Sequence, residues 1–407
     1  MSETGDVLYT VADIPEIRYD KHFSIHQDIA QCVNVYYGKT KRKSSRRNYI
    51  ATPKTYTINH ADTDMDLKVP AAENSCDSTA LLPKDLQKRV TFLIGNGFDL
   101  NIGLNTRYQD FYKYYILKNK DDILAKDIDE NYDNWSDLEL GLGKYTETVL
   151  PIKEEEFWAS EQNLENNLVD YLTEEVKRIN LDIDDRKKHI ENKMAESLLE
   201  FYKKLPDEAE KSIKRILSDA KKQYFFITFN YTDALDQCVK IIRRSRRMKS
   251  EGEEDVLHIH GTISGNMVLG VNDESQIANP KFRNKYEYKR LLIKRYINEY
   301  CGRENIKKAR DIIDGSTIIC IYGMSIGATD KMWWQYIGKW LQGCSDRRLV
   351  IFAKDSTVYK VKKYSGNYGE KVKDQFKNVG GLANVWNKIK NKIYVEVNAD
   401  MFDFKVV

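Results

Sequence analysis

The sequence has no closely spaced cysteines, no long apolar run and no strong excess of charge. Six cysteines are scattered over 407 residues without a C-x-x-C pair, which argues against a zinc ribbon, and a disulfide framework is not expected in so large a chain. The apolar runs stay well short of the ~18 residues of a membrane-spanning helix, so no membrane partner is expected. Acidic and basic residues nearly balance at a formal +3, so overall charge gives no reason to expect a nucleic-acid partner.

The N-terminal part differs in composition from the rest. Its first residues, MSETGDVLYT, lack the basic start and apolar stretch of a signal peptide, so we expect a cytoplasmic protein. Residues 1–85 are polar and include the basic run GKTKRKSSRRN from Gly38. This run is not a P-loop, because Val33 stands where that motif has its first glycine. We expect residues 1–85 to form a partly irregular extension, with the basic run as a solvated arm or a phosphate contact.

From residue 86 onwards, short apolar runs alternate with helical patterns. The runs RVTFLIG, QYFFITF, STIICIY, RRLVIFA and NKIYVEV are continuously apolar, which is typical of strands buried on both faces of a parallel sheet. LHIHGTISGNMVLG predicts two shorter strands separated by a turn. Residues from about 120 to 220 and from about 280 to 314 have helical patterns, the first being a helical insertion. Residues 86–407 therefore predict an α/β fold, a Rossmann-like parallel sheet with helices on both faces.

Glycines and polar residues follow the first two strands. Gly95, Asn96 and Gly97 end the first apolar run, where glycines let backbone amides approach a phosphate closely. A tight strand-to-helix turn would need the same glycines, so both interpretations stay open. Asn230 follows the second run and is suited either to holding a sugar hydroxyl or a water molecule, or to capping a helix.

Two later strands end in similar clusters. His258 and His260 share a strand face, as metal ligands would, but no third ligand stands nearby and no metal is expected. His260 suits a general base because its pKa lies near neutrality, although a structural histidine would explain it too. Gly323 and Ser325 are suited to a phosphate or to a helix cap. Because the carboxyl ends of parallel strands meet at one edge, these clusters predict a ligand cleft there.

Five motifs carry a resemblance to a known family. FLIGNGFDLNIGLNTRYQDF, NWSDLE, ITFNYTD, HIHG and IYGMSIGATD, in this order, resemble the AbiH family of bacteriophage abortive-infection proteins, from about residue 88 to the C-terminus. That family is in turn similar to the sirtuin-like fold, a Rossmann-type NAD-binding domain. Sirtuin-like proteins open with G-A-G, a glycine six residues on and an aliphatic residue, and Gly95, Gly97, Gly103 and Leu104 stand at those positions.

The later sirtuin-like motifs can be placed in the same register. The T-x-N motif, the catalytic His-Gly pair and the G-x-S motif match Thr228 and Asn230, His260 and Gly261, and Gly323 and Ser325. Asn96 replaces the small alanine, Asp99 stands where serine is usual, and Thr232 stands where an aspartate is usual. The zinc module of the deacetylases has no cysteine pairs here, so protein deacetylation is not expected.

The resemblance implies a phage-defence protein that binds a nucleotide, NAD, and hydrolyses its nicotinamide–ribose bond. It implies that Asn230 orients the ribose or a water molecule, that His260 is the general base, and that Asp99 binds a ribose hydroxyl or stabilises the developing cation. The remaining cofactor-binding residues would be Gly95, Asn96, Gly97, Phe98, Thr228, Gly323 and Ser325.

Other functions remain open at this point. The same cleft would serve a non-catalytic nucleotide-sensing module that acts through a partner. An RNA-directed effector is suggested by RRSRRMK and the basic arm, and a purely structural defence component is a third alternative. The resemblance leaves room for a phage-derived trigger and for a homo-oligomer.

Overall fold

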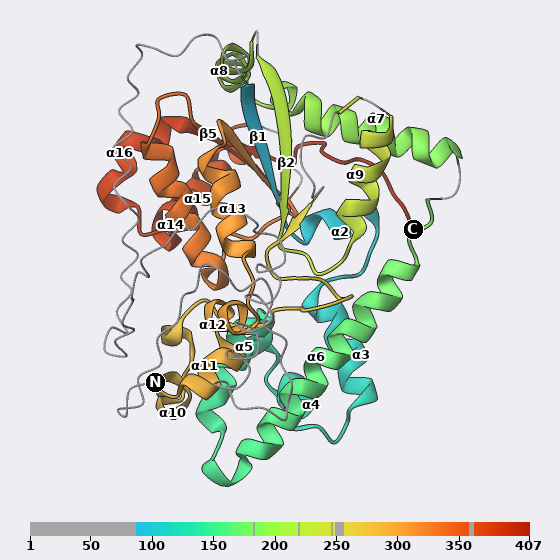
Figure 1. Cartoon of the computed structure of the whole chain (residues 1–407), viewed down its shortest axis with the longest axis vertical. Coiled ribbons are helices and arrows are strands. Elements are labelled where there is room, and N and C mark those ends of the chain that lie inside the picture. Colours follow the sequence, from blue (N-terminus) through green and yellow to red (C-terminus); the bar gives the residue numbers. More distant parts are fainter. Residues whose placement is uncertain (1–86, 182–183, 219, 246, 249–255, 358–361) are drawn as a thin grey trace, which may run out of the picture. The chain divides into compact units, whose positions relative to one another are not determined.

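The computed structural model describes residues 87–407, except 182–183, 219, 246, 249–255 and 358–361 (Figure 1). The predicted N-terminal extension and its basic run lie outside the described residues, and the domain boundary near residue 86 stays a prediction. Among the described helices, none combines the length and the apolar character needed to cross a membrane.

Six strands of the described chain form one parallel sheet. They are β1 (Gln87–Ile94), β2 (Lys221–Thr228), β3 (Leu257–His258), β4 (Ile318–Tyr322), β5 (Arg348–Ala353) and β6 (Ile393–Val397). Their order is β3-β2-β1-β4-β5-β6, and each neighbouring pair is parallel. This is the strand order of Rossmann folds, which reverses direction between β1 and β4. The predicted parallel α/β sheet is confirmed.

Both faces of the sheet are buried, which explains why its strands are continuously apolar. In β1, Phe92 and Ile94 face one core and Leu93 faces the other. Helices α7 (Asp184–Leu199), α8 (Asp207–Leu217) and α9 (Ala234–Arg244) pack into the first core. Helices α13 (Asn305–Asp314), α14 (Lys331–Gln342) and α15 (Lys362–Val379) pack into the second (Figure 1). The short helix α16 (Trp386–Ile389) joins the second core through Ile389.

A third core lies beyond the carboxyl ends of the strands. We call its helices the helical layer: α3 (Tyr108–Lys118), α4 (Ile123–Glu130), α5 (Leu138–Tyr145), α6 (Glu154–Lys177), α10 (Pro280–Asn284), α11 (Tyr286–Leu292) and α12 (Lys294–Tyr300). The short helix α2 (Gly97–Ile102) leads from β1 towards it. The helical patterns predicted near 120–220 and 280–314 are confirmed. The first of these segments is shared between two cores, because α4–α6 build the layer whereas α7 and α8 cover the sheet.

The prediction of two strands in LHIHGTISGNMVLG was wrong for the second piece. Gly261 has a φ of +69° and turns the chain away from the sheet directly after β3. The following residues form a bridge between Thr262 and Gly265, and the amide of Val268 donates to the carbonyl of His260 at 2.8 Å. The segment therefore folds back over the strand end instead of adding to the sheet.

Candidate functional site

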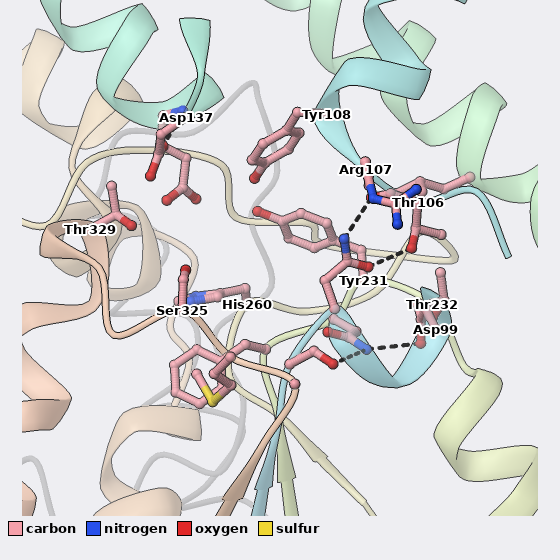
Figure 2. Close-up of a pocket in the computed structure, with 18 of the residues that line it drawn as sticks. Asp99, Thr106, Arg107, Tyr108, Asp137, Tyr231, Thr232, His260, Ser325 and Thr329 are labelled. Carbon is pink, nitrogen blue, oxygen red and sulfur yellow. Dashed lines mark hydrogen bonds between the residues drawn. The ribbon is translucent and has the colours of Figure 1, made fainter. Parts of the chain in front are cut away.

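A cavity of about 180 Å³ lies between the carboxyl ends of the strands and the helical layer (Figure 2). Seven of the predicted site residues line it: Gly95, Asn96, Asp99, Asn230, His260, Gly323 and Ser325. The helical layer and the loops beside it contribute Thr106, Arg107, Tyr108, Glu139, Leu168 and Lys294, among others. Three predicted residues, Gly97, Phe98 and Thr228, are not among the lining residues.

The loop predicted to hold a phosphate is bonded to the loop that follows β4. The amides of Gly95 and Gly97 donate to the carbonyls of Tyr322 at 3.0 Å and Gly323 at 2.7 Å, and that of Phe98 donates to Gly95. Gly323 has a φ of +67°, and a Cβ there would lie 2.8 Å from the Cα of Gly97. Contact between the two backbones therefore requires these glycines. Phosphate binding stays a prediction, and three amides assigned to it already have acceptors.

Asn96 forms hydrogen bonds to Thr106 and so positions the neighbouring Arg107 at the cavity. Its Nδ2 donates to the carbonyl of Thr106 at 2.8 Å, and the Thr106 hydroxyl donates to Asn96 Oδ1 at 2.5 Å. Arg107 follows directly, lines the cavity, and has a side chain that is 58% exposed. Its guanidinium lies 3.8 Å from Asp110, which neutralises it only weakly at this exposure. The cavity thus has a positively charged residue with access to solvent.

Asn230 is fixed at both its side chain and its backbone. Its Nδ2 donates to the carbonyl of Gly95 at 3.2 Å and to Asp99 Oδ1 at 2.9 Å, while its backbone amide donates to the Thr228 hydroxyl at 3.2 Å. The His258 ring donates from Nδ1 to the Asn230 carbonyl at 3.1 Å. Because both hydrogens of Nδ2 are engaged within the protein, Oδ1 is the atom with which Asn230 can bind a ligand hydroxyl or water.

Asp99 lies behind Asn230 and is only 1% exposed. Its second oxygen, Oδ2, accepts from the Thr232 hydroxyl at 2.6 Å, and Figure 2 shows these two residues side by side. Burial raises the pKa of Asp99 to about 7, although the hydrogen bonds from Thr232 and Asn230 and the nearby His258 act to lower it. Both carboxylate oxygens have protein partners, so the contact that Asp99 makes at the site is with Asn230.

His258 and His260 face different partners. The Nε2 of His258 lies 2.8 Å from Asp236 Oδ2, and its Nδ1 faces a carbonyl, so both ring nitrogens must donate. Burial lowers the pKa of His258, but Asp236 outweighs that effect and holds the pKa above its ordinary value. His260 instead places Nε2 3.2 Å from Asp330 Oδ1. In the part of the chain that the structure describes, no group of three or more His, Cys, Asp or Glu could hold a metal.

Four groups, three of them buried and Asp330 partly buried, form what we call the charge chain, which links the helical layer to the sheet. Lys294 of α12 lies 2.8 Å from Glu139 Oε2 of α5 and 3.1 Å from Asp330 Oδ1. Asp330 ends the 3₁₀ helix Ala328–Asp330 and contacts His260 through that same oxygen. All four groups line the cavity.

The charge chain sets the tautomer of His260. Burial alone would raise the pKa of Asp330, but Lys294 and the His260 hydrogen bond outweigh burial and hold it well below its ordinary value. An ionised Asp330 can only accept, so His260 Nε2 carries the hydrogen and Nδ1 carries the lone pair. Burial and the charge of Lys294 lower the pKa of His260, which keeps it neutral at neutral pH. A neutral imidazole oriented by a carboxylate is suited to accepting a proton.

Glu139 lies at the other end of the charge chain. Burial raises its pKa to about 8 even though Lys294 acts to lower it. Burial acts to lower the pKa of Lys294, but the charges of Asp330 and Glu139 outweigh burial and raise it above its ordinary value. Burial thus favours the neutral form of Glu139, whereas the two carboxylates favour the charged form of Lys294.

Arg107, Glu139, Lys294 and Asp330 are among the cavity-lining residues that were not predicted from the sequence. Arg107 lies within the first motif of the resemblance, Glu139 ends NWSDLE, and Asp330 ends IYGMSIGATD. The motifs were thus the signal that could have found them. Lys294 lies in LLIKRY, where a lysine among apolar residues was the only indication.

The comparisons with known proteins agree with these motifs. A model of the family described as Bacteriophage abortive infection AbiH matches residues 91–352. The match covers more than half of the chain and includes each residue that lines the cavity. No curated protein matches the chain.

Proposed function

The chain belongs to the AbiH family of bacteriophage abortive-infection proteins, and from that premise we propose that it is a phage-defence protein whose cavity binds NAD and hydrolyses the nicotinamide–ribose bond. The observation that carries the proposal is the position of the cavity. It lies at the carboxyl ends of β1 and β4, where the strand order reverses, and dinucleotides bind at that place in sheets of this order.

A contact within the site supports the resemblance to sirtuin-like proteins. Those proteins usually have serine where Asp99 stands and aspartate where Thr232 stands. Here the carboxylate and the hydroxyl stand at the opposite positions, and they form a hydrogen bond at 2.6 Å. This pair lies behind Asn230, which fits an asparagine that must be held in one orientation.

The proposed reaction assigns one role to each residue. Cleavage of the bond between C1′ of the ribose and nicotinamide develops positive charge on the sugar, and the bonding electrons leave with the nicotinamide. A water oxygen forms the new bond to C1′, and His260 Nδ1 accepts the proton that this water loses. Asn230 Oδ1 accepts from a ribose hydroxyl or from the water. A general base of this kind accelerates such a step by about 10²–10⁴-fold.

Two further residues act at the edges of the site. Asp99 holds the amide of Asn230 in one orientation, so its role is to position that residue. Arg107, which is exposed beside the cavity, is suited to pairing with the pyrophosphate. This role does not require the amides of Gly95, Gly97 or Phe98.

One observation favours a second candidate function, a nucleotide sensor without turnover. His260 Nδ1 is buried and has no hydrogen-bond partner among the described residues. Hydrolysis therefore requires a movement that exposes Nδ1 to the attacking water, whereas binding of a nucleotide does not. The cavity would then hold NAD and transmit its presence to a partner.

The test combines nicotinamide release with NAD binding by calorimetry, on wild type, His260→Ala and Asn230→Ala. Lys371→Gln, on the exposed surface of α15, is the control. Release by wild type and the control, lost in His260→Ala while NAD still binds, supports hydrolysis. Binding without release, including after addition of lysate from infected cells, supports the sensor and contradicts hydrolysis. Absence of NAD binding contradicts both.

A further inference from the structure

The segment that contains α10–α13 carries a net positive charge. Residues 280–314 hold eleven lysines and arginines, five acidic residues and four tyrosines. The formal net charge of the whole chain is only +3, so the remainder of the chain is net negative. The balanced total that argued against nucleic acid therefore conceals a strongly basic segment.

Cation–π and ring contacts link side chains of α11 to side chains of α12 in two groups, one around Tyr296 and the other around Tyr300. We call the two groups together the basic–aromatic surface, and it consists of Tyr286, Lys289, Arg290, Arg295, Tyr296 and Tyr300. The Arg295 guanidinium lies 4.6 Å from the Tyr296 ring centre, and Lys289 Nζ lies 5.5 Å from it. Tyr286 meets Tyr296 edge to face at 5.9 Å, and Arg290 lies 4.6 Å from the ring centre of Tyr300.

Tyr286, Arg295 and Tyr300 are exposed, whereas Lys289, Arg290 and Tyr296 are half-buried. Tyr286 is 51% exposed, Tyr300 is 62% exposed, and the Arg295 side chain is 53% exposed. Neighbouring cations hold the rings in place, which lowers the entropy lost when a flat group stacks on them. Exposed aromatic rings among lysines and arginines are the combination with which proteins bind unpaired bases and their phosphates.

The positive charge of the surface is only partly compensated. Glu274 accepts from the Tyr296 hydroxyl at 2.9 Å and is shared by Lys289 at 3.3 Å and Arg295 at 3.8 Å. Arg290 forms no ion pair with any residue that the structure describes. Within these contacts one carboxylate meets three cations, and two further exposed carboxylates, Glu287 and Glu299, lie on the same helices. The excess of positive charge is therefore local to the contacts around Tyr296 and Tyr300.

We propose that the basic–aromatic surface binds single-stranded nucleic acid. Lys289, Arg290 and Arg295 contact phosphates, and Tyr286 and Tyr300 stack on bases. A single strand is favoured over a duplex because only unpaired bases offer their faces to an aromatic ring. This function lies on the outside of α11 and α12 and goes beyond the proposed reaction, on which it does not depend.

The first experiment measures binding of fluorescently labelled single-stranded RNA and DNA of mixed sequence as a function of salt. Arg290→Gln/Arg295→Gln should weaken binding about tenfold or more at physiological salt. It should also reduce the slope of log K against log salt by about 1.4, since each phosphate contact on a single strand contributes about 0.7. The matched control, Lys371→Gln/Lys388→Gln, removes the same charge from exposed positions on α15 and α16. It should change neither quantity.

A second pair of variants separates stacking from charge. Tyr286→Leu and Tyr300→Leu should each weaken binding about fivefold or more while the salt slope stays constant. A duplex of the same sequence should bind less tightly than the single strand. Equal weakening by the control pair, tighter binding of the duplex, or no binding by wild type at low salt overturns the proposal. Preference for RNA or for DNA identifies the ligand within it. Nicotinamide release is measured on the same variants. Because the two proposals are independent, either one can fail while the other holds.

Discussion

The buried carboxyl of Asp99 gives a prediction whose size follows from the structure. Its pKa is raised from the ordinary value of 3.8 to about 7, chiefly by burial. One pKa unit corresponds to about 1.4 kcal/mol, so ionising Asp99 in the folded protein costs up to about 4 kcal/mol. Asp99→Asn removes this cost and preserves the packing. The new amide can accept from Asn230 through Oδ1 and donate through Nδ2 to the Thr232 hydroxyl, which can act as donor or acceptor.

The sign follows from comparing the folded and unfolded states. Below about pH 4 the carboxyl is protonated in both states and the cost is absent. As the pH rises from about 4 to about 7 the unfolded chain ionises first, so the folded state loses stability relative to it. Above about pH 7 the full cost applies. Relative to Asp99→Asn, wild type should therefore lose about 2.5 kcal/mol of unfolding free energy between about pH 5 and about pH 8.

The assay is urea unfolding followed by circular dichroism across that pH range, for wild type, Asp99→Asn and Asp374→Asn. Asp374 is an exposed carboxylate on α15, so its variant should keep the pH dependence of wild type. A separation between wild type and Asp99→Asn that stays constant from acidic to alkaline pH would refute the reasoning. Asp99 would then titrate alike in the folded and unfolded states.

The remaining predictions concern the two loops at the switch point and the charge chain. Gly323→Ala places a side chain at positive φ and against the backbone of Gly97, so it should lower the unfolding free energy by about 1–3 kcal/mol or more; an unchanged urea midpoint would contradict the close contact. Lys294→Met leaves the buried Glu139 and the partly buried Asp330 without their cation and should cost about 3–5 kcal/mol at neutral pH. This loss should shrink in acid as the carboxyls become protonated, and a loss that urea unfolding shows to be independent of pH would contradict it.

The sheet could be predicted because its strands have a local signature. Burial on both faces makes β1, β2, β4 and β5 continuously apolar, and their alternation with helical patterns indicates parallel pairing. The prediction of a second strand after β3 was wrong because of a backbone turn, which the pattern of apolar residues does not indicate. Gly261 adopts a positive φ, and Val268 then bonds back to the carbonyl of His260.

The site was predictable where a strand delivers the residue. Asn230 and His260 follow β2 and β3 directly, so the topology brings them to one edge of the sheet. Lys294 and Glu139 reach the same cavity from two helices of the helical layer. Their meeting depends on how the layer packs on the sheet, and no spacing within a single segment encodes that packing. The glycines that end β1 are ambiguous for a different reason. A close contact between two backbones and a phosphate-binding loop both require glycine, so the sequence does not distinguish them.

Because of the charge chain, the ionisation of Asp330 and the tautomer of His260 depend on the packing of the helical layer against the sheet. Its members come from α5, from the turn after β3, from α12 and from the turn before α14, so none of these segments contains a usable base by itself. If the helical layer separates from the sheet, Asp330 loses the cation that keeps it ionised, and His260 loses the acceptor that fixes its tautomer. An unfinished or cleaved chain that lacks α12 is therefore without an oriented base, whatever it retains of the sheet. His260 can therefore act as an oriented base only when the helical layer and the sheet have packed together, and it loses that ability when they separate.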